Sequence, residues 1–207
     1  LNLVKRTKNM KNEDRWKYYS DLIIKALNSV GSRFYKINIS TSYYESQAVE
    51  KLVRERYFCY ELYHQMRCLD EKINKFTSIK ISPEIDKRGY KLIRSNKVPD
   101  FIIHEEGTMN NNILVVEVKG VLKPSGIAKD IHTISIFLNN CKYEKGMFIL
   151  YNYSLNELKN KIKTIVKSKK YLSIENKRCF KKIMVICKKD NMSDIESIYL
   201  NELISNE

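Results

Sequence analysis

The sequence predicts an α/β fold, with a mixed central sheet flanked by helices and further helical segments at both ends of the chain. Three observations support this fold class. Apolar residues recur at helical spacing in several segments, shorter apolar segments of strand length lie between them, and turns rich in Gly and Asn separate neighbouring strands. With 207 residues, the chain is long enough to bury a core within one main domain.

The N-terminal part, residues 1–41, is expected to be a helical extension. Trp16, Tyr19 and Ile23 follow helical spacing and predict a helix over residues 13–29. Residues 33–40 alternate between apolar and polar and predict a short strand or an extended linker. The main domain is expected over residues 42–190, and a C-terminal helix over residues 191–207.

A long helix is expected over residues 42–69, because its first residues, SYYE, form a capping-box pattern. Apolar residues cluster on one side of this helix, and Glu55 falls in the middle of that side. A carboxylate there is costly unless it meets a partner. Glu55 is therefore either paired with an arginine, such as Arg56 or Arg88, or a functional acid.

The remaining elements follow in chain order. They are a hairpin with arms at residues 79–85 and 88–93, strands at 99–104 and 113–119, a helix at 127–140, a strand at 143–151, a helix after Ser154, a strand at 183–187 and a short helix after Ser193. Ser154 with Glu157 and Ser193 with Glu196 form capping boxes that predict the starts of these last two helices.

The strand at residues 113–119 carries charged groups on an otherwise apolar face. Its alternation places Glu117 and Lys119 on the same face as Val115. Asp100, directly after Pro99, begins the preceding strand and can converge with Glu117 if the two strands are adjacent. One explanation is a salt bridge between Lys119 and either acid at the sheet edge. The other is a site in which two carboxylates bind Mg²⁺ or Mn²⁺ beside a lysine.

The larger pattern favours the second explanation. Pro99-Asp100, sixteen intervening residues and then Glu117-Val118-Lys119 resembles the signature of the PD-(D/E)XK nuclease superfamily. The segments HEEG (residues 104–107) and NILVVEVK (residues 112–119) are similar to a bacterial branch of that superfamily, and the resemblance covers residues 44–153. It implies the restriction-endonuclease-like fold, with an αβββαβ core, and the expected order of elements agrees with that core.

The resemblance also implies a chemistry, metal-dependent hydrolysis of phosphodiester bonds that leaves a 5′-phosphate and a 3′-hydroxyl. Asp100, Glu117 and the backbone carbonyl of Val118 are expected to hold Mg²⁺ or Mn²⁺, and Lys119 to position or activate the attacking water. Glu55 is the expected helix acid, which binds a second ion or orients a metal-bound water.

The sequence leaves the roles of two further acids, Glu61 and Asp130, undecided. Glu61 is the reserve for the helix acid, since the sequence around it also resembles that region of the family. Lys129 and Asp130 resemble a frequent Lys/Asp position in the family branch. An acid in the first turn of a helix also complements the helix dipole, and this simpler role for Asp130 is equally consistent with the sequence.

The composition favours a polyanionic partner, since the formal net charge is +14, with 38 Lys and Arg against 24 Asp and Glu. We expect nucleic acid, DNA rather than RNA, and a homodimer is compatible with cutting both strands. Lysines are dense over residues 155–190. This region either contacts the phosphate backbone of a nucleic acid or is a basic helix face exposed to solvent. The five cysteines form no C-x-x-C pair and predict neither disulfides nor a zinc site.

No hydrophobic signal segment or bilayer-length apolar run is visible, so no membrane association and a cytoplasmic location are expected. Two other classes of function remain. The same fold can act as a non-catalytic module that binds nucleic acid or a partner protein. A basic structural protein is the other class, and it predicts that no divalent metal binds.

Overall fold

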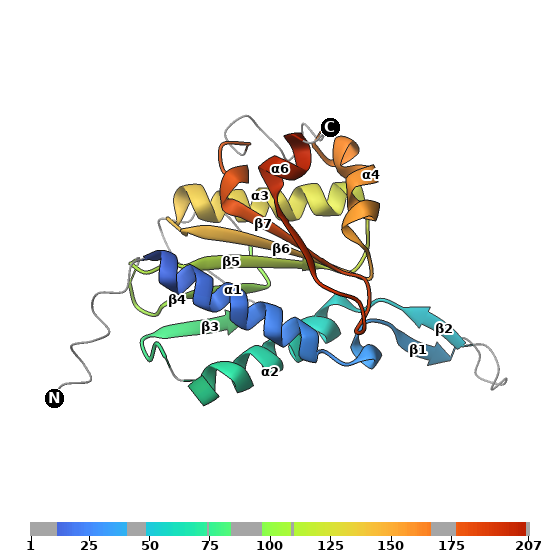
Figure 1. Cartoon of the computed structure of the whole chain (residues 1–207), viewed down its shortest axis with the longest axis horizontal. Helices are drawn as coiled ribbons and strands as arrows, with labels where there is room; N and C mark the ends of the chain where they lie inside the picture. Colours follow the sequence, from blue (N-terminus) through green and yellow to red (C-terminus); the bar gives the residue numbers. More distant parts are fainter. Residues whose placement is uncertain are drawn as a thin grey trace.

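The computed structural model describes residues 12–40, 49–73, 75–83, 97–108, 110–166 and 177–205. A six-stranded mixed sheet in the order β3-β4-β5-β6-β7-β8 forms its centre, and β1 (Ile37–Ser40) and β2 (Val49–Leu52) form a separate antiparallel pair (Figure 1). The sheet strands are β3 (Ile79–Pro83), β4 (Phe101–Glu105), β5 (Leu114–Lys119), β6 (Lys145–Tyr151), β7 (Ile183–Lys188) and β8 (Glu196–Tyr199). The prediction of an α/β fold with a mixed sheet flanked by helices is confirmed.

Helices cover both faces of this sheet (Figure 1). On one face lie α1 (Asn12–Ser29) and α2 (Glu55–Ile73), and on the other α3 (Pro124–Asn140), α4 (Leu155–Val166) and α6 (Leu200–Ser205). The alternation of β5 divides its side chains between the two cores: Val116 and Val118 pack with α1 and α2, and Val115 packs with α3. Strands β5, β6 and β7 are parallel, so their carboxyl ends meet at one edge of the sheet.

Several expected elements are confirmed. Helix α1 matches the predicted helix, and its residues Trp16 and Tyr19 lie in the same buried cluster as the sheet. At the start of α4, Ser154 N–H donates to Glu157 Oε2 (2.8 Å) and Glu157 N–H donates to Ser154 Oγ (3.3 Å), which is the predicted capping box. Helix α3 begins three residues before the predicted start, because Pro124 is suited to a first helical position. The second arm of the predicted hairpin, residues 88–93, lies outside the described residues.

The long helix expected from residue 42 is wrong in its first part. Strand β2 occupies residues 49–52 and pairs with β1, and α2 begins only at Glu55. The apolar spacing that suggested a helix carries no information about the partner strand. The backbone N–H and C=O groups of β1 pair with those of β2, and this pairing makes the segment a strand. The capping-box residues 42–45 lie outside the described residues.

The expected helix after Ser193 is also wrong in its first part. Residues 196–199 form β8, antiparallel to β7, and only Leu200–Ser205 is helical. Glu196 does not cap that helix, because its Oε2 accepts a hydrogen bond from Leu155 N–H at 2.8 Å. Pairing along the open edge of β7 prevails over the local capping pattern.

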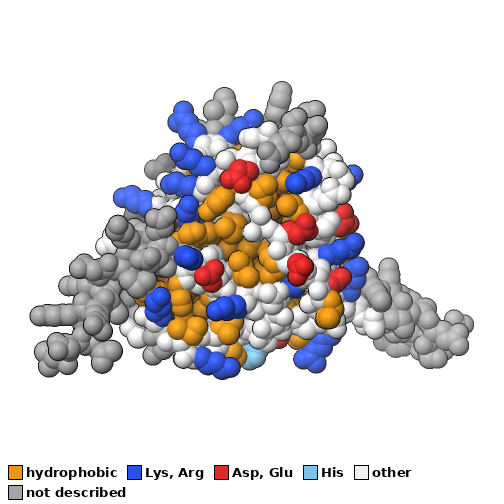
Figure 2. All heavy atoms as spheres, in the orientation of Figure 1, with side chains coloured by type: hydrophobic (Ala, Val, Ile, Leu, Met, Phe, Trp, Pro, Cys, Tyr) orange, Lys and Arg blue, Asp and Glu red, His pale blue; other side chains and the backbone are white. Residues whose placement is uncertain are grey.

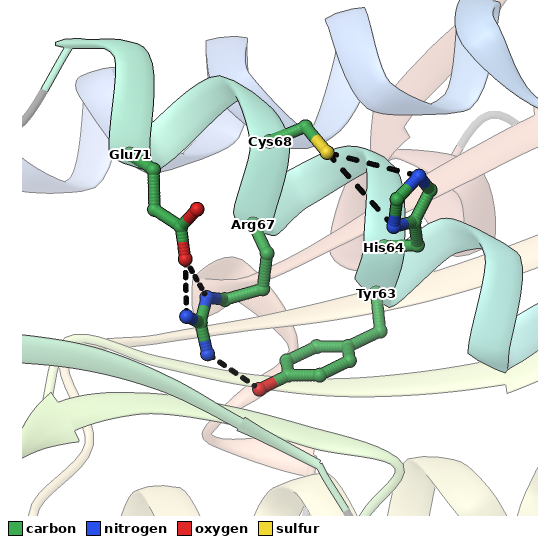
Figure 3. A network of polar contacts seen from close by, with 5 residues as sticks. All are labelled: Tyr63, His64, Arg67, Cys68 and Glu71. Atoms are coloured by element: carbon green, nitrogen blue, oxygen red, sulfur yellow. Dashed lines mark hydrogen bonds and ion pairs between the residues drawn. The ribbon is translucent and has the colours of Figure 1, made fainter.

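Helix α2 carries two groups of polar contacts, each between residues one helical turn apart (Figure 3). Arg67 Nε donates to Glu71 Oε1 (3.1 Å), and Arg67 Nη1 donates to the Tyr63 hydroxyl (3.1 Å). Cys68 Sγ lies 3.7 Å from His64 Nε2, and all five cysteines are free thiols, as expected. Within the described ranges, no helix combines the length and the apolar character needed to cross a bilayer.

The packing of α3 on β6 depends on Gly146, and we expect Gly146→Ala to lower the free energy of unfolding by about 1–3 kcal/mol. A Cβ at this position would lie 2.2 Å from Ile134 Cγ2, so the helix or the strand must shift. Gly31→Ala is the control, because its new Cβ would lie 3.9 Å from Phe34 Cδ2, an ordinary contact distance. Urea unfolding of both variants tests this, and an unchanged stability for Gly146→Ala would contradict the close approach of α3.

Candidate active site

A cavity of about 370 Å³ opens where β5 ends, between α2 and α3. Charged residues from four elements or their flanks line it, namely Glu55, Lys97, Asp100, Glu117, Lys119, Lys129 and Asp130. The structure therefore brings together all four side chains singled out in the sequence, Glu55, Asp100, Glu117 and Lys119.

Asp100 lies directly before β4 and faces the neighbouring strand. Because β4 pairs antiparallel with β5, with Phe101 opposite Val116, the Asp100 carboxylate reaches Val118, whose N–H donates to Asp100 Oδ2 at 2.7 Å. Burial raises the pKa of Asp100, while the hydrogen bond from Val118 opposes that rise. The backbone of β5 thus fixes the first carboxylate beside the second.

Glu117 is a buried acid of the cavity, with only 6% of the residue exposed, the same fraction as for Asp130. Burial is the main cause that raises its pKa well above the ordinary value, and the nearby charges of Asp100 and Asp130 add to it. The carboxyl groups of Glu117 and Asp100 are also hydrogen-bonded to each other. A hydrogen bond between two carboxyl groups requires a proton, and the raised pKa of Glu117 favours its protonated form.

Lys119, the last residue of β5, lies between two carboxylates. Its Nζ is 2.9 Å from Glu55 Oε2 and 3.1 Å from Asp130 Oδ2. Burial alone would lower the pKa of Lys119, but Asp130 and Glu55 outweigh it and raise that pKa above its usual range. The simple salt-bridge explanation required Asp100 or Glu117 as the ion-pair partner of Lys119. Among the described residues, its partners are instead Glu55 and Asp130.

Glu55 reaches the cavity for a different reason from the one expected. It is the first residue of α2 and its side chain is 35% exposed, so it does not lie in the middle of a buried helix face. Besides its ion pair with Lys119, its Oε1 accepts a hydrogen bond from Gly120 N–H at 3.4 Å. The reserve acid, Glu61, lies further along α2, where it accepts a hydrogen bond from Gln65 Nε2 (2.7 Å), and it does not line the cavity.

Asp130 is the site residue that sequence reasoning left undecided. It lies past the first turn of α3 and is buried, so the simple role as a first-turn acid is wrong. Burial raises its pKa to about 6 although Lys119 opposes the rise. The Lys129-Asp130 pattern was the available signal, but the true start of α3 at Pro124 was needed to place Asp130 on the face toward β5.

Gly120 allows the end of β5 to lie close to α2. A Cβ on this residue would lie 2.3 Å from Tyr151 Cζ and 2.5 Å from Val53 Cγ1. Tyr151 in turn stacks on Phe58 of α2 with ring centroids 3.8 Å apart. Only glycine fits here, and its small size lets the backbone N–H approach Glu55.

The donor set at this cavity is chemically suited to a hard divalent cation. Glu55, Asp100, Glu117 and Asp130 outnumber the directly paired ammonium of Lys119, and a bound cation would offset the cost of ionising Glu117 beside Asp100. Within the described part of the chain, no three His, Cys, Asp or Glu side chains are arranged as a ready metal site. The expected set is of another kind, since it consists of two carboxylates and the carbonyl of Val118.

The buried acid pair predicts a pH dependence of stability in EDTA. A carboxyl whose pKa is raised by folding lowers the free energy of unfolding when it must ionise in the folded state. This loss of stability is absent below the pKa of the unfolded state and grows as the pH rises toward the pKa of the folded state. Glu117→Gln removes this contribution, so we expect the variant to be more stable than the wild type at pH 8, by on the order of 1 kcal/mol, with little difference at pH 4. Urea unfolding across this range measures it. Glu61→Gln, on the outside of α2, is the control, and equal shifts in both variants would contradict the prediction.

Comparisons with known proteins give no further assignment. The chain matches no protein-family model, no curated protein and no solved structure. What this chain does is therefore inferred from the side chains around the cavity, from their contacts, and from the short motifs of the sequence.

Proposed function

We propose that this chain is a metal-dependent nuclease of the PD-(D/E)XK type that hydrolyses phosphodiester bonds, with DNA as the expected substrate. The observation that carries the proposal is the convergence of Asp100, Glu117 and Lys119 in one cavity at the end of β5. Two adjacent carboxylates and a lysine held in place beside them are the groups that such a reaction uses.

The order of the elements supports the finer fold assignment that we propose. Helix α2, strands β3, β4 and β5, helix α3 and strand β6 follow one another as α, β, β, β, α, β, and helices cover both faces of the sheet. This is the αβββαβ order that the resemblance implies. The motif residues and the order of elements are independent features of the chain, and both favour a restriction-endonuclease-like core.

Asp100, Glu117 and the carbonyl of Val118 are the groups that would hold Mg²⁺ or Mn²⁺. When bound, such an ion supplies Lewis acidity and lowers the pKa of a water molecule. Loss of the proton from Glu117 is a condition for this binding, since a protonated carboxyl is a poor ligand. The raised pKa favours the protonated form of Glu117 as long as no cation lies beside the two carboxyl groups.

Lys119 has a role that its contacts define. Because Glu55 and Asp130 raise its pKa, it stays a cation and is suited to stabilise negative charge on the phosphate and to position a water. It is poorly suited to act as a base. Glu55 and Asp130 act through Lys119 by holding its ammonium group at the cavity, and the expected role of Glu55 toward a second ion or a water remains part of the proposal.

One observation favours a second candidate, a non-catalytic module that binds nucleic acid or a partner protein. The charged groups of the cavity satisfy one another, since Glu117 bonds Asp100 and Lys119 pairs with Glu55 and Asp130. A network of this kind is stable without metal. The two candidates differ in whether Mn²⁺ binds and whether a substrate is cut.

We expect Lys119→Ala to lower cleavage by about 10²–10³-fold or more, because an oriented cation that stabilises the transition state is lost. The assay uses supercoiled plasmid, linear duplex, single-stranded DNA and RNA with Mg²⁺ or Mn²⁺. Lys123→Ala, which removes an exposed lysine at the start of α3 outside the cavity, should cut normally. Normal turnover of Lys119→Ala with any of these substrates would contradict the proposal.

Calorimetry with Mn²⁺ tests the metal site separately from turnover. The wild type should bind Mn²⁺ and release a proton, because Glu117 must ionise. Asp100→Asn and Glu117→Gln should each weaken binding by at least about tenfold, and Glu61→Gln should bind as the wild type does. Absence of any heat of binding in the wild type would instead favour the non-catalytic module.

A further inference from the structure

Basic side chains do not gather in a single stripe on the visible face of the molecule. Figure 2 shows Lys and Arg groups spread over that face, with acidic and hydrophobic groups between them. The net charge of +14 therefore does not locate a path for a nucleic acid. The hollows of the surface are more informative, because they combine shape with a local charge.

A second cavity, of about 450 Å³, lies beside the candidate active site. It is lined by residues near β1, by the residue that follows β6 and by the segment that follows β7, among them Arg33, Tyr35, Lys36, Asn152 and Lys189. Its charge is opposite in character to that of the first cavity, since three cationic side chains face one acid, Asp190. The Asp190 carboxylate is used locally, because its Oδ1 accepts hydrogen bonds from the N–H groups of two following residues, Met192 (3.0 Å) and Ser193 (2.8 Å).

The two cavities meet at Gly120. Asn152, which lines the second cavity, donates from Nδ2 to Gly120 O (3.4 Å) and to Tyr35 O (3.3 Å). On its other side Gly120 donates from N–H to Glu55, which lines the first cavity. The backbone of Gly120 therefore links a lining residue of the acidic cavity to a lining residue of the basic one.

The basic groups lie in or directly beside regular elements: Arg33 in the 3₁₀ helix Ser32–Phe34, Lys36 before β1 and Lys189 after β7. Lys188, at the end of β7, is buried and donates to Asn28 Oδ1 (3.0 Å) and Ser193 O (2.6 Å), which fixes the turn that begins with Lys189. The guanidinium of Arg33 lies 4.8 Å from the centre of the Phe34 ring. The second cavity thus presents cations on a prepared surface rather than on long unsupported loops.

We infer that the second cavity binds backbone phosphates of the same nucleic-acid strand whose scissile bond lies in the first cavity. This inference rests on the proposed function and adds that the substrate is a polynucleotide that spans both cavities. The ends of β5 and β7 lie two strand spacings apart, about 10 Å. A strand with one phosphate per about 3.4 Å of rise covers that distance in about three nucleotides.

Binding in EDTA tests this inference without turnover. The variant Arg33→Ala/Lys36→Ala/Lys189→Ala is compared with Lys177→Ala/Lys181→Ala/Lys182→Ala, which removes the same charge from exposed residues before β7, at the opposite end of that strand. By fluorescence anisotropy with labelled single-stranded and duplex oligonucleotides, the first variant should bind at least about tenfold more weakly. The slope of log K against log salt should fall by about two to three. Equal losses in both variants would overturn the inference.

Cleavage separates a failure of this inference from a failure of the proposed function. Bis(p-nitrophenyl) phosphate, a small diester, reaches only the first cavity, so the cavity variant should cleave it as the wild type does. The same variant should show a KM for a polynucleotide raised by about tenfold or more, with a smaller change in kcat. If the wild type cuts and this KM is unchanged, the inference falls and the nuclease stands. If the wild type does not cut but the variant has lost binding, the nuclease falls and the second cavity remains a phosphate-binding site.

Discussion

Lys119 connects the two helical layers of the molecule at the carboxyl end of β5. Its ammonium group contacts Glu55 of α2, which covers one face of the sheet, and Asp130 of α3, which covers the other. A lysine that is mostly buried needs such partners, because its charge would otherwise be costly away from water. One cation at the end of β5 therefore links a segment of each helical layer, in addition to the apolar packing of both layers on the sheet.

The acid pair beside Lys119, Asp100 and Glu117, differs from the lysine because the nearby charge of Lys119 does not offset the cost of ionising Glu117. Asp100 is held by the backbone N–H of Val118, and Glu117 is buried next to it with a raised pKa. The fold gains nothing from ionising Glu117 at this place, and a hydrophobic residue on β5 would be better suited to the core. A costly group of this kind is common where a protein binds a ligand or carries out chemistry, since function and stability often make opposite demands.

The parallel arrangement of β5, β6 and β7 sets the spatial relation of the two cavities. Parallel strands end at the same edge, so Lys119, Asn152 and Lys189 follow one another across the sheet although they are far apart in the chain. Gly120 lets the chain pass between Tyr151 and Val53, where no side chain fits, and its N–H and C=O groups bond residues of the two cavities. The acidic and basic surfaces thus lie side by side through strand order rather than through any local sequence motif.

The sequence by itself determined the α/β class, the central strands and the shared face of Glu117 and Lys119, because alternation along β5 is a local property of the chain. It predicted that Asp100 joins them on the condition that the two strands are adjacent, and the pairing of β4 with β5 meets that condition. Only the tertiary structure decided the start of α2, the strand character of residues 196–199 and the ion-pair partners of Lys119. These features depend on pairing and packing between segments distant in sequence, as with β2 on β1 and α3 on β5. Local propensity carries no information on such partners, since backbone and charged groups are satisfied wherever the fold brings them together.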